Sequence, residues 1–158
     1  MKVLVFSDSH GYVEGMLAAV EREKPQAMIH LGDMWADGQA LGRATPQIPI
    51  YRVAGNCDRY SYEPGQDLTI VRSLGGVVCY MTHGHLHGVK QGLLRLSLAA
   101  REAGASVVLF GHTHCCCCQE QSGVLLVNPG SCGRYGGTYA VLNIENGTVN
   151  CEIKKIDL

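Results

Sequence analysis

The fold of this chain follows from one stretch, KVLVFSDSHGYVEGMLAAVEREKPQAMIHLGD at residues 2–33. Two apolar runs within it, 3–6 and 27–31, have the length of buried strands. Between them, apolar residues recur at helical spacing at Val13, Met16, Leu17 and Val20, and a helix is expected to end near Lys24. A strand, a helix and a second strand in this order predict a βαβ unit with parallel strands.

The remaining chain extends this unit. Strands are expected at 50–54, 68–71, 77–81, 107–110, 115–119, 124–127, 138–144 and 148–153, with a helix over 89–103 and a short helix near Leu41. Glu145-Asn146-Gly147 is typical of a hairpin turn between the last two strands. We see no repeat and no linker, so we expect a single α/β domain over residues 1–158, with two mixed sheets facing each other and helices outside.

Composition narrows the class of protein. Apolar residues make up 46% of the 158, which argues against disorder. No apolar run approaches the ~20 residues that span a bilayer, and the first run is too short for a signal peptide, so we expect a cytoplasmic protein with no membrane partner. The net charge of −1, without a dense cluster of Lys or Arg, gives no strong signature of nucleic-acid binding.

Polar segments follow five of the apolar runs: Asp8-Ser9-His10, Gly32-Asp33, Gly55-Asn56, Thr82-His83-Gly84-His85 and Gly111-His112-Thr113-His114. Ligands of open α/β sheets gather beyond the carboxyl ends of the strands, so we expect these segments to converge. Imidazole, carboxylate and amide oxygen together suit Mn²⁺, Fe²⁺ or Zn²⁺ better than Mg²⁺ alone. Two such ions, about 3.5–4 Å apart, could share one carboxylate.

The order of these segments resembles that of the calcineurin-like metallophosphoesterase superfamily. Gly-Asn-Cys-Asp at 55–58 and Asn-Pro-Gly-Ser at 128–131 resemble its small bacterial and archaeal phosphodiesterase branch. The resemblance implies a four-layer α/β/β/α sandwich. It also implies a hydrolase, a phosphodiesterase in which a hydroxide bridging two metal ions attacks phosphorus in line, on a small phosphate-ester substrate.

The same resemblance implies two divalent transition-metal ions, manganese first, with nickel, cobalt, iron or zinc as alternatives. The first ion would be held by Asp8, His10, Asp33 and His114. The second would be held by Asp33, Asn56, His83 and His112, so that Asp33 bridges the pair.

One position departs from the family pattern. Many members have Gly-Asn-His-Glu, whose histidine contacts the phosphoryl group or protonates the leaving oxygen, and here Cys57 takes its place. A thiol is a poor substitute for an imidazolium at neutral pH. His85 is an alternative catalytic residue, and Asp58 is expected to orient the site from behind the ligands. Cys57 itself either contacts the phosphate or is a small residue tolerated in the turn.

Other residues leave two interpretations open. Trp35 either walls the substrate cleft or packs against the protein, and Arg59 and Arg134 could each meet a phosphate. His30 lies within a strand and is expected to be a hydrogen-bonded core histidine.

The cysteines at 115–118 are expected to form an ordinary strand, because side chains alternate between its faces and cannot all reach one metal ion. In the cytoplasm the eight thiols are expected to stay reduced.

A non-catalytic role is the alternative function. A retromer subunit is similar in fold to this superfamily and serves as a protein-interaction scaffold. Loss of metal ligands would favour that role, but every expected ligand position is filled here. Association into a homo-oligomer is left open by the sequence.

Overall fold

The first sheet is built around the βαβ unit that the sequence predicts. The computed structural model describes residues 1–60 and 66–157. In it, β1 (Lys2–Phe6), β2 (Ala27–His30) and β3 (Ile50–Arg52) pair in parallel. β9 (Thr138–Glu145) and β10 (Thr148–Lys155) complete the sheet as an antiparallel hairpin on the other side of β1. The sheet order is therefore β10-β9-β1-β2-β3.

The second sheet has the order β4-β5-β6-β8-β7. Its three central strands are parallel: β5 (Val77–Thr82), β6 (Val107–Leu109) and β8 (Val124–Asn128). Its edge strands, β4 (Thr69–Leu74) and β7 (Cys117–Gln121), are antiparallel to their neighbours. Both sheets are thus mixed, as predicted.

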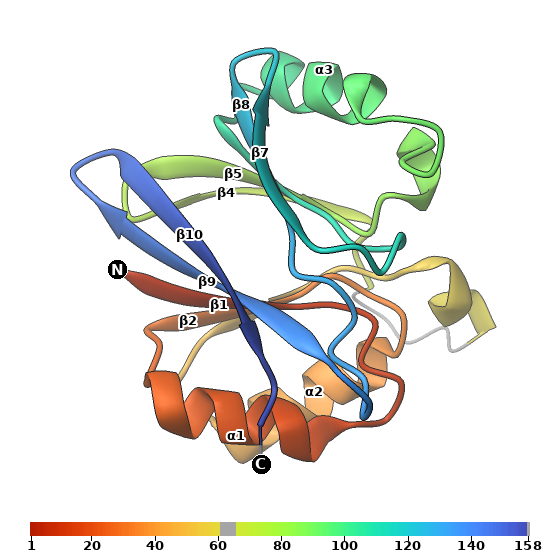
Figure 1. Cartoon of the computed structure of the whole chain (residues 1–158), viewed down its shortest axis with the longest axis vertical. Coiled ribbons are helices and arrows are strands. Elements are labelled where there is room, and N and C mark those ends of the chain that lie inside the picture. The colour runs from red at the N-terminus through yellow and green to blue at the C-terminus, as the bar shows by residue number, and fades with distance from the viewer. Residues whose placement is uncertain (61–65, 158) are drawn as a thin grey trace.

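Alternation of side chains produces the layers. Val3 and Val5 of β1 pack with Met81 and Leu109 of the second sheet, in the core between the two sheets. Leu4 and Phe6 point the other way and pack on α1 (Val13–Glu23) and α2 (Trp35–Ala44). On the far side of the second sheet, α3 (Leu94–Glu102) covers β6 and β8 (Figure 1). The α/β/β/α sandwich is confirmed.

Several boundaries differ from the predicted ones. The helix expected over 89–103 is shorter, because Gly88 and Gly92 adopt positive φ and α3 starts only at Leu94. A 3₁₀ turn, η2 (His85–His87), precedes it, and another, η1 (Asn56–Tyr60), follows β3. The helix near Leu41 is α2, with ten residues, and β7 begins two residues later than expected.

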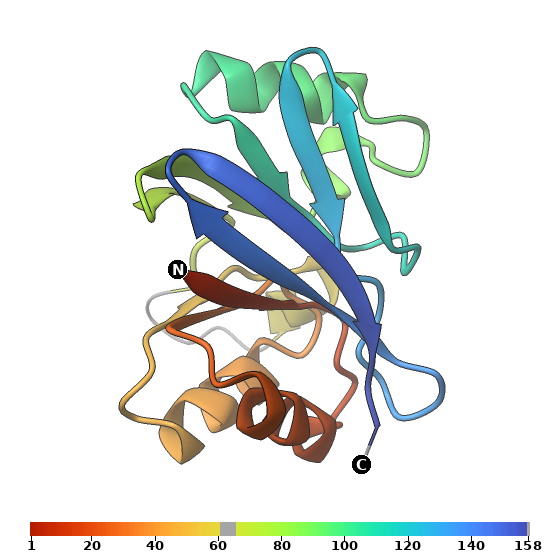
Figure 2. The ribbon, with the colours of Figure 1, turned by 60° about the vertical axis from the view of Figure 1, so that its left-hand side comes forward.

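The last hairpin agrees with its turn signal. Asn146 and Gly147 both have positive φ, 51° and 75°, as a type I′ turn requires, and β9 and β10 pair on either side of them (Figure 2).

One cysteine pair corrects the expectation that all thiols are reduced. A disulfide joins Cys118 of β7 to Cys151 of β10, whose Cα atoms are 6.5 Å apart. These strands are edges of different sheets, so only the packing of the sheets brings the two residues together.

No helix in the described residues is long and apolar enough to cross a membrane, and α1, with eleven residues, is the longest of them.

A buried carboxylate fixes the loops that follow β2 and β3. Asp58, 4% exposed, accepts hydrogen bonds from the backbone N–H groups of Asp33, Met34, Trp35 and Gly55, at 2.8–2.9 Å. Hydrogen bonds to a charged acceptor are stronger than neutral ones, and a buried N–H without a partner is costly. Asp58 therefore holds the backbone from Asp33 to Trp35 and that of Gly55, which precedes Asn56, in one arrangement.

Replacing Asp58 with Ala should destabilise the fold by about 3–5 kcal/mol, because several buried N–H groups lose their acceptor. Asp58→Asn keeps one acceptor oxygen and should cost less. Urea unfolding at pH 7 measures both, with Asp157→Ala, at an exposed position, as the control expected to change stability by less than about 0.5 kcal/mol. An Asp58→Ala chain as stable as the parent would contradict this role.

Candidate metal centre

The candidate ligands lie where strands end and the backbone turns sharply. Five of them have positive φ: Asp8 (54°), His10 (48°), Asp33 (54°), His112 (69°) and His114 (59°). Non-glycine residues rarely adopt this conformation, which costs on the order of 1–3 kcal/mol and is concentrated at functional sites. The strained backbone conformation therefore coincides with residues that the sequence predicts to bind metal ions.

One group of donors comes from the loops after β1 and β6. Donor atoms of Asp8, His10 and His114 all lie within 4.8 Å of one another, a spacing that could hold a metal ion. His114 Nε2 is 3.0 Å from Asp8 Oδ1, and the rings of His10 and His114 meet edge to face. Asp8 is fully buried, whereas both histidines are exposed. The group is therefore open to solvent on its histidine side.

A second group is more buried than the first. Donor atoms of Asp33, His83 and His112 also lie within 4.8 Å of one another. Leu31 O accepts a hydrogen bond from His83 Nδ1 at 2.7 Å, because a carbonyl oxygen can only accept. This bond fixes the tautomer, so Nε2 of a neutral His83 carries a lone pair toward Asp33 Oδ2, 3.4 Å away.

The bare Nε2 of His83 is evidence that the residues fit a cation. It finds no hydrogen-bond partner within the described part of the chain, and neither does the buried Oδ1 of Asn56. A lone pair facing a carboxylate is unfavourable unless a proton or a metal ion lies between them. Nitrogen and oxygen donors in this combination suit a divalent transition metal.

The two groups are neighbours. His83 Nε2 lies 3.9 Å from Asp8 Oδ1, so donor atoms of the two groups are in direct proximity. The backbone ties them as well, because Asp8 N donates to Gly32 O and Gly111 N donates to His83 O. All five polar segments predicted to converge do so.

Charge coupling across the second group is strong. Burial raises the pKa of Asp33, but His83 and the Cys57 N–H outweigh it and hold that pKa far below its usual range. Burial likewise lowers the pKa of His83, yet the carboxylates of Asp33 and Asp8 reverse the effect and the net shift is upward. In the absence of a metal ion, the group thus favours a carboxylate paired with a cation.

Two glycines leave room for the acidic ligands. A Cβ added at Gly55 would collide with the carboxylate of Asp33, and one added at Gly111 would collide with the Ser7 hydroxyl and crowd Asp8. Only glycine allows the loops after β3 and β6 to approach this closely.

Cys57 and His85 flank the second group. The Cys57 N–H donates to Asp33 Oδ1 at 3.0 Å, and its side chain is exposed. Burial, together with the carboxylates of Asp33 and Asp58, raises the pKa of the Cys57 thiol. The His85 ring centroid is 5.5 Å from that of His83 and 6.2 Å from that of His112, and burial with the charge of His83 lowers its pKa.

The sequence analysis missed a buried network beneath the ligands. Ser9 Oγ contacts His30 Nε2 at 2.8 Å and donates to Asp37 Oδ2 at 2.7 Å, and Gly32 N donates to His30 Nδ1. His30 is fully buried and hydrogen-bonded, as its strand position indicates, and burial lowers its pKa to about 4. The polar residues on either side of Asp8 were the available signal for such a network.

The turn at 128–131 supports the first group. Ser131 Oγ donates to Asp8 O at 2.8 Å, and Asn128 Nδ2 donates to Gly111 O and to Thr113 Oγ1. The Ser7 hydroxyl donates to Asp8 Oδ2. These contacts show that the turn holds the loops after β1 and β6.

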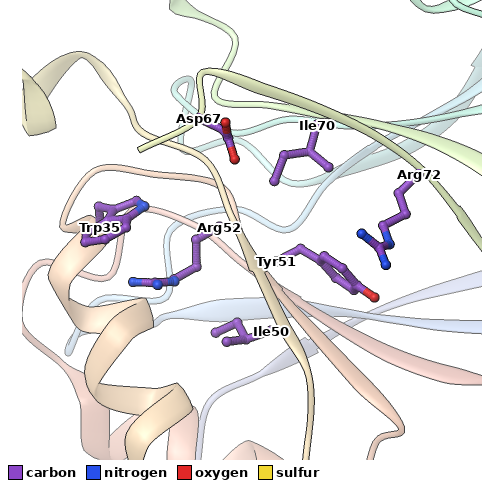
Figure 3. A pocket seen from close by; sticks show the side chains of 7 residues that line it. All are labelled: Trp35, Ile50, Tyr51, Arg52, Asp67, Ile70 and Arg72. Atoms are coloured by element: carbon purple, nitrogen blue, oxygen red, sulfur yellow. The ribbon is translucent and has the colours of Figure 1, made fainter. Parts of the chain in front are cut away.

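The remaining candidates lie outside the two groups. Trp35 is 4% exposed, with the Arg52 guanidinium 4.0 Å from its ring, and it lines a pocket of about 300 Å³ that also includes Asp67 and Arg72 (Figure 3). The Arg134 guanidinium lies 5.0 Å from the Tyr12 ring. The side chain of Arg59 lies outside the described part of the chain.

The chain is similar to known proteins, to some in sequence and to others in fold. The chain is 37% identical over 153 residues to the probable metallophosphoesterase YsnB of Bacillus subtilis, covering 92% of this chain and 86% of that one. It is 27% identical to the phosphodiesterase MJ0936 of Methanocaldococcus jannaschii, covering 85% and 86%. Vps29 of Entamoeba histolytica, solved in complex with zinc, has the same fold, with a TM-score of 0.76 at 22% identity over 99% and 100% of the two chains.

Residues 1–147 match the model of the calcineurin-like phosphoesterase superfamily domain. That span contains all seven candidate ligands and the two donor groups. The chain belongs to the calcineurin-like phosphoesterase superfamily.

Proposed function

We propose that the protein is a metal-dependent phosphodiesterase with two divalent ions at the carboxyl ends of its parallel strands. The observation that carries the proposal is the bare Nε2 of His83 lying between two carboxylates, 3.4 Å from Asp33 Oδ2 and 3.9 Å from Asp8 Oδ1. The relative named a phosphodiesterase supports a diester substrate.

The proposed ligands divide between the ions as the two donor groups do. Asp8, His10 and His114 would hold the first ion, and His83, His112 and Asn56 the second, with Asp33 shared. The unpartnered Oδ1 of Asn56 supports its inclusion. Manganese is the first choice, and nickel, cobalt, iron and zinc are alternatives with the same preference for nitrogen and oxygen donors.

Such ions, when bound, lower the pKa of a coordinated water and polarise the phosphoryl group. Hydrolysis then forms one bond from water oxygen to phosphorus and breaks one ester P–O bond, and the departing alkoxide takes up a proton. His85 is proposed to direct a ring N–H toward the departing oxygen, because it lies beside His83 and His112. Asp58 holds Asp33 and Asn56 in place throughout.

A scaffold without catalytic activity is the second candidate. The similarity to Vps29 favours it as far as the fold is concerned. A scaffold role would not require two groups of convergent metal-ligand atoms, and both groups are present here. A stable protein partner together with a chain that neither binds metal nor hydrolyses esters would support the scaffold.

Purified protein with Mn²⁺ should hydrolyse bis-(p-nitrophenyl) phosphate. Asn56→Ala should lower kcat/KM by more than about 100-fold, because loss of an outer-shell partner alone often costs about 10–100-fold. Asn150→Ala, at an exposed position of β10, is the matched control and should retain full activity. Absence of hydrolysis with Mn²⁺, Ni²⁺, Co²⁺, Fe²⁺ and Zn²⁺ alike would disprove the proposed activity.

Restoring the family histidine should relieve dependence on a good leaving group. Cys57→His places an imidazole beside Asp33, where it can protonate a departing alkoxide, and general acid catalysis is typically worth about 10²–10⁴-fold. The ratio of kcat/KM for a phenyl ester to that for a nitrophenyl ester should rise at least about tenfold relative to Cys57→Ser. Equal ratios in the two variants would show that position 57 does not take part in leaving-group departure.

A further inference from the structure

A pocket of about 420 Å³ lies between the segment after η2 and the start of β7. Val89, Leu93 and Phe110 line it together with the run Cys115 to Cys117. Its volume falls within the range of about 300–1,000 Å³ that is usual for small-molecule sites. It contains none of the residues assigned above to metal binding.

Two residues that line this pocket contact or belong to loops that carry candidate metal ligands. Val89 packs against Gly84, between His83 and His85, so closely that a Cβ at Gly84 would lie 3.0 Å from a Val89 methyl carbon. Thr113 also lines the pocket and stands between His112 and His114 in sequence. Asn128 Nδ2 donates a hydrogen bond to Thr113 Oγ1 at 3.0 Å. The pocket is therefore bordered by the loops that carry His83 and His85 and by the loop that carries His112 and His114.

The side chains that line the pocket indicate which kind of ligand it could bind. The lining residues, all within the described ranges, include no carboxylate, and their polar side chains besides the thiols are Lys90, Thr113 and Gln119. An apolar lining of this kind suits an aromatic or branched aliphatic group more than a sugar, which would need several hydrogen-bond partners. Lys90 adds a positive charge, which favours a ligand that carries a phosphate.

We propose that this pocket holds an apolar organic group of the ester, aryl or branched alkyl, while the phosphate of the same molecule lies at the metal centre. The inference rests on the proposed function and adds its substrate class: phosphate esters of apolar alcohols.

Two ligands with the same head group test the pocket. In the Mn²⁺-loaded full-length chain, phenylphosphonate should inhibit diester hydrolysis with a Ki at least about tenfold lower than that of methylphosphonate. Gln119→Trp, which fills the pocket from β7, should remove that preference and leave the Ki of methylphosphonate unchanged. Gln121→Trp, two residues along the same strand and outside the pocket, is the matched control and should keep the preference.

A second readout does not depend on turnover. Cys115 and Cys116 are exposed and carry no disulfide in the described chain, so peptide mass spectrometry can follow their alkylation by N-ethylmaleimide. Phenylphosphonate should slow alkylation of Cys116 several-fold more than methylphosphonate does. Equal inhibition by the two ligands, with equal alkylation, would overturn the pocket proposal and leave the phosphodiesterase standing. No hydrolysis with any metal, and no protection by either ligand, would overturn both.

Discussion

The site depends on the approach of His83 Nε2 to Asp33 Oδ2, 3.4 Å apart in a buried position. Leu31 O accepts a hydrogen bond from the N–H of His83 Nδ1, so in neutral His83 the other ring nitrogen points a lone pair at a carboxylate. A lone pair and a carboxylate this close are stabilised by a proton or a metal ion between them, and transition metals accept both donors. The surrounding loops, the buried Asp58 and the close approach at Gly55 all maintain this one juxtaposition.

Much of the arrangement could be predicted, because it follows from strand order. Apolar runs at 3–6, 27–31 and 50–54 indicated parallel strands, whose carboxyl ends share an edge of the sheet. Polar residues directly after those runs therefore had to meet. The hairpin at Asn146-Gly147 was equally predictable, because its backbone conformation depends on those two residues alone.

The rest depends on contacts between distant segments. Nothing near Cys118 in the sequence indicates Cys151, which reaches it only because edge strands of two sheets meet. The hydrogen bond from Ser9 to Asp37 joins the loop after β1 to the first turn of α2, 28 residues away, and its neighbour His30 shows only a strand position in the sequence. The pocket beside Thr113 forms where segments after η2 and before β7 come together. Periodicity predicts elements, but it does not predict which side chains face one another across a packed interface.

The most direct measurement of the central claim is anomalous diffraction from crystals of the full-length protein soaked in Mn²⁺. The account predicts two anomalous peaks about 3.5–4 Å apart, with the Asp33 carboxylate between them. One peak would lie beside Asp8, His10 and His114, and the other beside His83, His112 and Asn56. A single peak, or peaks remote from Asp33, would contradict it.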